Sequence, residues 1–169
     1  MKYDSSVALH WNYYGLVVRG TPVFDEVWND WTSGYYFFID QGYDVDTSDY
    51  ESCYEVFKLS PDYWTYVTGA CYWADSSPIN FDDWNTVKVY AKGTSMKFYI
   101  NDYLMWSSTV SGPTSGRIGV FTWTEGTQPE TTYVDWAVAG MAVLPTAAEQ
   151  VAPAGQIPYH PKPGVHCQK

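Results

Sequence analysis

Aromatic side chains are the residues of this sequence best suited to binding a ligand. They make up 19% of its 169 residues, with 16 tyrosines and 9 tryptophans. Trp28 and Trp31 fall in a turn-rich stretch that we expect to be a loop, and Trp123 lies at a predicted strand end. Tyr90 and Tyr99 occupy polar positions of two predicted strands. Aromatic rings stack on sugar C–H faces, so these five residues predict a carbohydrate-binding surface, with a protein interface as the alternative.

Four acidic residues crowd a second predicted loop, at Asp44, Asp46, Asp49 and Glu51. Calcium binds oxygen-rich loops of this kind. The EF-hand pattern, with its central glycine and terminal glutamate, is absent. We therefore expect a solvated acidic loop, and calcium is the alternative.

Hydrolysis of a glycosidic bond needs two carboxylates roughly 5 to 10 Å apart, one as the acid and one as the base or nucleophile. Asp82 and Asp83 are adjacent and so point apart, while Asp44 and Asp46 lie in the predicted loop. No predicted strand shows alternating acidic residues, and none of the three histidines is near a serine or cysteine in a nucleophile motif. We therefore expect no enzymatic activity.

Cys53 and Cys71 are predicted to form a disulfide across a hairpin. Two strand-like runs, Ser52–Lys58 and Thr65–Trp73, flank a turn-prone segment around Pro61. A loop of odd length places the cysteines opposite each other, with Cα atoms about 4.5 to 5.5 Å apart and within disulfide range. A loop of even length would shift the register and leave two separate buried thiols. The disulfide would indicate an oxidising environment, and hence an extracellular or cell-surface location.

The clearest elements that could position these residues lie between Phe81 and Trp106. Apolar and polar residues alternate in two runs there, which predicts half-buried strands. The apolar members are Val87, Val89 and Ala91, then Met96, Phe98 and Ile100. Gly93 supplies the positive φ of a tight turn between the runs, and Asn101-Asp102 tolerates a second turn. The stretch therefore predicts three consecutive antiparallel strands.

Four segments carry a family resemblance through their order and spacing. They are Trp84–Val89, Lys97–Asn101, Ser115–Val120 and Tyr133–Trp136. With them, the chain from about Ser6 to Ala139 resembles the concanavalin A-like lectin/glucanase superfamily, in particular its laminin-G-like and glycosidase-associated jelly-roll modules. The resemblance implies a sandwich of two antiparallel sheets and a frequent role in binding or cutting glycans, although a fold alone does not transfer a function.

We expect an all-β fold, with a two-sheet antiparallel jelly-roll sandwich over residues 1–140 and a proline-rich tail or linker at 141–169. Five prolines recur between positions 145 and 163, where the apolar alternation has ended. Family members place edge strands before the strand expected within Ser5–Gly20, and this chain begins almost directly on it. The resemblance therefore implies missing N-terminal edge strands and an unpaired sheet edge, which strand exchange with a neighbouring chain would complete.

The charge balance restricts the partners. Nine Lys and Arg residues stand against 19 acidic residues, a formal net charge of −10. Such a surface repels phosphate backbones and anionic lipid headgroups, so we expect no nucleic-acid partner. No apolar run approaches the roughly 20 residues that cross a bilayer, and we expect no membrane insertion.

These observations leave two functional hypotheses. The first is a secreted, non-catalytic, lectin-like module that binds a glycan or a cell-wall polysaccharide. The second is a structural or adhesive subunit of an extracellular assembly or filament, whose partner is another protein chain. The loop tryptophans favour the first, and the expected unpaired edge and proline-rich tail favour the second.

Overall fold

The computed structural model describes residues 1–3, 12–21, 23–25, 30–44, 49–61, 63–73, 77–81, 83–124, 132–135, 137–140 and 150–151. Within these ranges the chain contains strands and no helix. The all-β prediction is therefore confirmed, and the described residues include no helix that could cross a membrane.

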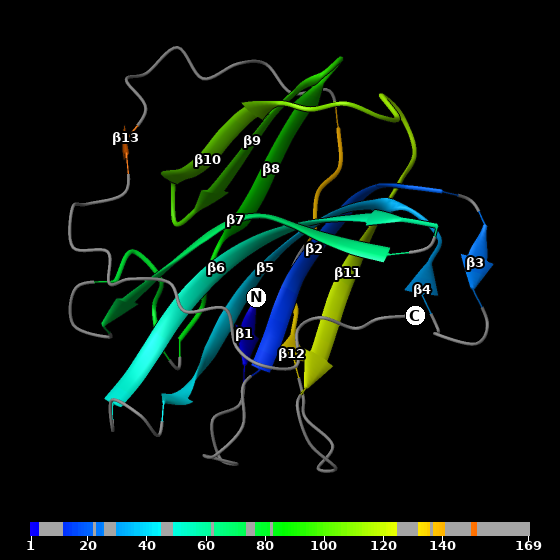
Figure 1. Ribbon diagram of the computed structural model, residues 1–169. Helices are drawn as coiled ribbons and strands as arrows, with labels where there is room; N and C mark the ends of the chain where they lie inside the picture. Colours follow the sequence, from blue (N-terminus) through cyan, green and yellow to red (C-terminus); the bar gives the residue numbers. More distant parts are fainter. Residues whose placement is uncertain are drawn as a thin grey trace.

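The larger sheet has five antiparallel strands in the order β11-β2-β5-β6-β7 (Figure 1). Their bounds are β2 Asn12–Gly20, β5 Gly34–Asp44, β6 Asp49–Ser60, β7 Tyr63–Trp73 and β11 Arg117–Thr124. β5 and β6 pair over eleven positions, from Gly34 with Leu59 to Asp44 with Asp49. This long pairing forms the centre of the sheet.

The second sheet is the predicted meander. It consists of β8 (Val87–Lys92), β9 (Ser95–Ile100) and β10 (Tyr103–Thr109), and β10 also pairs in parallel with the short β13 (Gln150–Val151). Gly93 takes a φ of 55° in the first turn, and Asn101 and Asp102 take 49° and 67° in the second. These left-handed residues sit where the sequence predicted them, because both turns need positive φ angles.

Two short ribbons complete the described structure. β1 (Lys2–Tyr3) pairs with β12 (Thr132–Tyr133), and β3 (Phe24–Asp25) pairs with β4 (Asp30–Trp31). All described pairings except that of β13 are antiparallel.

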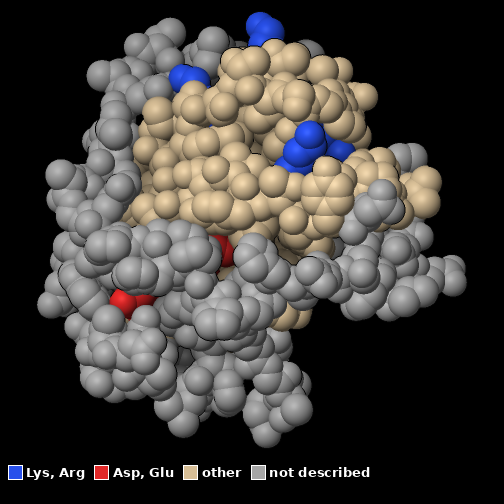
Figure 2. Space-filling view, viewed as in Figure 1, with Lys and Arg blue, Asp and Glu red and all other residues tan. Residues whose placement is uncertain are grey.

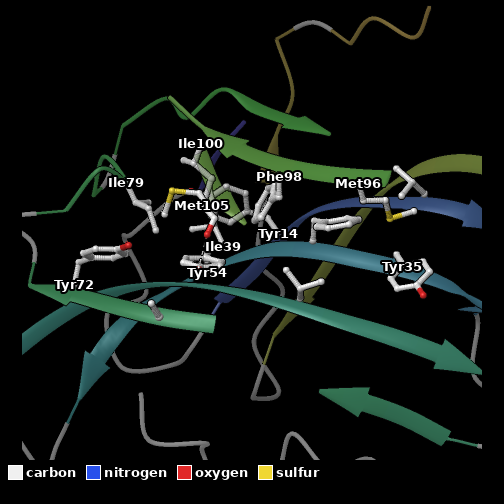
Figure 3. Packing of buried hydrophobic residues seen from close by; sticks show 14 residues of the cluster. Tyr14, Tyr35, Ile39, Tyr54, Tyr72, Ile79, Met96, Phe98, Ile100 and Met105 are labelled. Carbon is white, nitrogen blue, oxygen red and sulfur yellow. Dashed lines mark hydrogen bonds between the residues drawn. The ribbon is translucent and has the colours of Figure 1, made fainter. Parts of the chain in front are cut away.

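The main core lies between the two sheets (Figure 3). The Phe37 and Phe98 rings, one from each sheet, have centroids 5.2 Å apart. The Tyr54 hydroxyl crosses the same layer and donates a 2.8 Å hydrogen bond to the carbonyl of Met105. The other buried members are Tyr14, Val18, Tyr35, Ile39, Val56, Ala70, Tyr72, Ile79, Met96 and Ile100. The two-sheet antiparallel sandwich is thus confirmed.

The expectation of an unpaired edge along the first long strand is wrong for Asn12–Gly20. β2 pairs with β5 on one side and with β11 on the other. The second neighbour of β2 comes from Arg117–Thr124, about a hundred residues later in the chain. Local patterns do not reveal such distant pairings.

The β6–β7 hairpin positions the disulfide by a route that the sequence did not show. Ser60 pairs with Tyr63, so the loop holds two residues, the even length that would separate the sulfurs. The register then shifts between Val56 and Phe57, which leaves Val67 as the extra residue of a β-bulge. The bulge restores the alignment, and Cys53 and Cys71 form the predicted disulfide with Cα atoms 4.0 Å apart.

Removing the disulfide tests its contribution to stability. The bridge closes a loop with a sequence separation of 18 residues. We expect a Cys53→Ala, Cys71→Ala double variant to lose about 3 kcal/mol of unfolding free energy, mainly because the unfolded chain gains freedom. Urea denaturation without reductant measures the loss. As a control, reductant should lower the urea midpoint of the unsubstituted chain toward that of the variant, and should not alter the midpoint of the variant. If the variant and the unsubstituted chain have the same midpoint without reductant, the prediction is contradicted.

Candidate functional site

The five-stranded sheet has a second apolar face, opposite the main core. In β5, odd-numbered residues such as Phe37 and Ile39 belong to the main core, while Tyr36 and Phe38 belong to a separate buried cluster. Rings from all five strands meet on this outer face. We call this set the aromatic platform: Tyr13, Tyr36, Phe38, Phe57, Trp64, Tyr66, Phe121 and Trp123.

The platform is continuous across the sheet. From one edge, Trp123 lies 4.9 Å from Tyr13, and Tyr13 lies 5.5 Å from Phe38, measured between ring centroids. Phe38 stacks on Phe57 at 5.4 Å, and Phe57 contacts Tyr66 on the opposite edge strand at 5.4 Å. Such offset and edge-to-face pairs each add about 0.5 to 1.5 kcal/mol beyond their buried area.

Gly15 makes part of this packing possible. It pairs with Phe121 on one side and with Phe38 on the other. A Cβ at this position would lie 2.1 Å from the Phe37 carbonyl oxygen and 2.6 Å from the Phe38 Cα. Since no side chain stands between them, the Phe38 and Phe121 rings stack at 5.6 Å across β2.

Three carboxylates share the outer face with the rings. Glu51 and Glu55 occupy alternate positions of β6, and Asp40 on β5 pairs with the residue between them, Cys53. Asp40 is therefore diagonal to both glutamates, a relation that places Cα atoms about 7 to 8 Å apart. All three are buried, with 1% of Asp40, 5% of Glu51 and 1% of Glu55 exposed.

The structure places two acidic residues on the same face of one strand, Glu51 and Glu55 of β6. The sequence predicts a loop that extends to Glu51, whereas β6 already begins at Asp49 and includes both glutamates. Their spacing of four residues was the available signal, because a strand places such residues on the same side. Carboxylates at these separations are chemically able to share a proton-transfer reaction, provided that a substrate can reach them.

Tyr66 and Gly69 shape the surroundings of Glu55. Gly69 pairs with Glu55, and a Cβ at Gly69 would lie 3.0 Å from the Tyr66 hydroxyl and 3.3 Å from the Glu55 Cγ. The missing side chain leaves room for the phenol and the carboxylate side by side. Burial first, and the negative charge of Glu55 second, raise the pKa of Tyr66 to about 12. The phenol therefore remains a hydrogen-bond donor throughout the neutral range.

Glu51 lies against the disulfide. Its carboxylate and the sulfurs of Cys53 and Cys71 lie within 4.8 Å of one another, a cluster with the residue types of a metal site. Both sulfurs are in the covalent bridge, so they do not supply the thiolates that a metal would require. The described geometry of this cluster is that of a structural bridge beside a carboxylate.

The structure separates the aromatic residues that the sequence proposed as a site. Trp123 is part of the platform, and 38% of it is exposed. Trp31 lies over Gly20 and Gly119 and packs against the outer cluster. Tyr90 and Tyr99 are buried on the second sheet, where the Lys88 ammonium lies 5.1 Å from the Tyr99 ring centre. Trp28 lies outside the described residues.

The proposed calcium ligands are only partly described. Asp44 is the last residue of β5 and Asp49 the first of β6, so the expected loop is shorter than predicted. Glu51 is a buried strand residue. Asp46 lies outside the described residues.

Sequence reasoning missed most of the platform. The run Tyr35-Tyr36-Phe37-Phe38-Ile39 has no polar alternation, so it did not reveal that its two sets of side chains face different layers. Apolar residues at both odd and even positions are typical of a strand buried on both faces. That signal predicts a covered second face without identifying its other residues.

No protein-family model, curated protein or solved structure matches this chain.

Gly15 offers a test of how the platform is assembled. We expect Gly15→Ala to lower the free energy of unfolding by about 3 kcal/mol, because the added methyl overlaps the β5 backbone and overpacks the sheet. Gly140→Ala is the matched control, since no atom of the described residues lies within 4 Å of its Cβ position. Chemical denaturation measures both. Equal stability of the two variants would contradict the close approach of β2 and β5.

Glu55 offers a test of the electrostatics. Removing its charge by Glu55→Gln should lower the pKa of Tyr66 from about 12 toward the ordinary value of 10.0, without reaching it, because burial is the larger cause. Tyr54 is the internal control: its pKa is also raised to about 12, by burial and by neighbouring Tyr72 and Tyr66. Carbon NMR of labelled tyrosines distinguishes the two residues. A shift of Tyr54 as large as that of Tyr66 would contradict the assignment.

The raised tyrosine pKa values also fix the direction of the stability change at high pH. The unfolded chain loses these protons near pH 10, before the folded chain does at about 12. The contribution of these two tyrosines to the free energy of unfolding is fully present below pH 10, and it should be lost as the pH rises from 10 to 12. The loss should be smaller in Tyr54→Phe, because one of the two groups is then absent.

Proposed function

We propose that this protein is a non-catalytic, lectin-like module that binds a neutral oligosaccharide through the exposed rings at the two edges of the aromatic platform. The observation that carries the proposal is the linked series of rings across all five strands, with an exposed ring at each edge. Trp123 is exposed to 38% and Tyr66 to 37%. These rings offer flat apolar faces with a polar edge, the combination that stacks on sugar rings.

The distance between the two exposed rings favours a chain of sugars over a single sugar, because the Tyr13, Tyr36, Phe38 and Phe57 rings between them are buried. Trp123 and Tyr66 lie on the two outer strands, β11 and β7, with three strands between them. At about 4.8 Å between neighbouring strands, they are separated by about 19 Å across the sheet. The half-buried rings of Phe121 and Trp64 lie on the same two strands and extend the surface along the strand direction.

The charge beside the platform favours an uncharged ligand. Asp40, Glu51 and Glu55 lie on this face, and the paired positions from Gly119 to Trp123 and their partners across the sheet include no lysine or arginine. In the face shown by Figure 2, the visible Lys and Arg atoms lie in the upper half of the view and the visible Asp and Glu atoms lie in the lower half. Uronic acids and sulfated sugars would be repelled by the carboxylates.

Burial supports binding without cleavage. Asp40 and Glu55 are each 1% exposed, whereas a general acid must come within hydrogen-bond reach of the bond it protonates. We assign the ligand contacts to the exposed rings, and to the carboxylates a role in the potential around them. The proposal also retains the concanavalin A-like jelly-roll relationship and an extracellular location, which the two-sheet sandwich and the buried disulfide support.

The alternative of a subunit completed by exchange at its first strand has lost its motivating observation. It required an unpaired edge along β2, and β2 has a neighbour on each side. The proline-rich tail that also favoured it lies outside the described residues, apart from Gln150–Val151 in β13.

Truncation of the exposed indole tests the proposed function. We expect an array of neutral, uronic-acid-containing and sulfated oligosaccharides to show binding to neutral members. Trp123→Ala should weaken that binding about tenfold or more, because it removes one of the two exposed rings that we assign to the ligand. Trp84→Ala is the matched control, because Trp84 is 44% exposed and belongs to the 77–86 connection instead of the platform. Calorimetric titration with the best array member measures both variants.

The outcomes separate a binding role from a structural role. Thermal melting should show that Trp123→Ala keeps the fold, since the indole is partly exposed. Binding restricted to anionic sugars, or an equal loss in Trp84→Ala, would contradict the assignment. Release of reducing sugar from a bound oligosaccharide would contradict the non-catalytic role.

A further inference from the structure

We propose that the free edge of β11 binds a second copy of this chain, so that the two five-stranded sheets join into one. β11 is an edge strand of the larger sheet. It pairs with β2 along one side over eight positions, and no described strand pairs with its other side. A strand of this length presents a row of unpaired N–H and C=O groups on that side.

The other described edges carry features that hinder strand addition. β7 is interrupted by the bulge at Val67, and β8 carries the exposed Lys88 and Lys92. β10 already pairs with β13. Bulges, edge lysines and covering segments are the devices by which natural sheets prevent further pairing.

Within the described residues, β11 has no bulge and no lysine between Ile118 and Thr124, and β12 reaches it through the 3.0 Å hydrogen bond between the Thr122 and Thr132 hydroxyls. The only register shift of β11 lies before Ile118, and its only charged residue is Arg117 at the first position. Large apolar side chains are nevertheless exposed along it, with Ile118 at 58% and Val120 at 49%. An edge that is regular, uncharged and apolar is predicted to pair with another strand.

If two copies of this chain associate, their charge favours contact through β11 over contact through other surfaces. Each copy carries a formal charge of −10, so most contacts between copies bring like charges together. β11 contributes no acidic residue. An antiparallel partner centred on Val120 or Phe121 would place the two Arg117 residues at opposite ends of the strand pair, about 20 to 27 Å apart and well beyond the Debye length of about 8 Å.

The side-chain pattern restricts the symmetry of the pair. Gly119, Phe121 and Trp123 face the platform side, while Ile118 and Val120 face the other side. A two-fold axis perpendicular to the sheet keeps each face on its own side, so odd-numbered residues pair with odd-numbered residues. The axis therefore passes midway between the two copies of one residue of β11, such as Val120 or Phe121. Both aromatic platforms then lie on the same face of a continuous sheet.

A lysine on the free edge tests the proposal. Sedimentation velocity and native mass spectrometry over a dilution series should show a dimer in reversible equilibrium with monomer. Val120→Lys should raise the dimer dissociation constant about tenfold or more, because the added charge loses water on pairing. Val67→Lys is the matched control: Val67 is a valine of the other edge strand, is 38% exposed, and should leave the constant unchanged.

Hydrogen exchange of the unsubstituted chain gives a second measurement that does not depend on a variant. The amides of Ile118–Thr124 that do not donate to β2 should exchange faster below the dissociation constant than above it, while β5 amides should not change. A chain that remains monomeric at every concentration overturns the proposal. A dimer that Val120→Lys leaves intact, or that Val67→Lys disrupts, overturns it as well. Val120 lies on the side opposite the platform, so these results do not depend on sugar binding.

Discussion

The burial of β5 on both faces is the constraint on which the rest of the structure depends. Tyr36, Phe37 and Ile39 have no exposed surface, although alternate side chains point to opposite layers. One layer is the main core, closed by the meander, and the other is the aromatic platform. Because β5 has strand neighbours on both sides as well, it fixes the positions of β2 and β6 and, through them, of both edge strands. The carboxylates follow from the same alternation, since Asp40 continues the outward series of Tyr36 and Phe38.

Local patterns in the sequence were sufficient for the parts of the fold made by chain neighbours. The meander was predictable because its strands alternate regularly and its turns contain Gly93 and Asn101-Asp102, which take positive φ angles. The opposition of Cys53 and Cys71 was predictable as a possibility, but the bulge that produces it was not. A bulged valine has no distinctive local signature, and only the final register shows it.

Long-range partners and the identity of faces could not be predicted in this way. The partner of β2 on its second side lies far along the chain, and nothing in either strand specifies the other. The candidate site depends on this information, because the platform combines β11 and β2 with the β5–β6–β7 strands. Of the residues that the sequence suggested, Trp123 joins the platform and Trp31 packs beside it, while Tyr90 and Tyr99 are buried in another layer.

The pairing of β2 with β11 has a consequence for the order in which the molecule is made. Asn12 pairs with Thr124, so 112 residues separate the partners in the chain. At a synthesis rate of about 5 to 20 residues per second, β2 waits roughly 6 to 22 seconds for this neighbour to be translated. β5, β6 and β7 are made much earlier, so the nascent sheet first exists with β2 as its open border. During that interval β2 would be an edge strand, with the unpaired backbone groups that can pair with another chain.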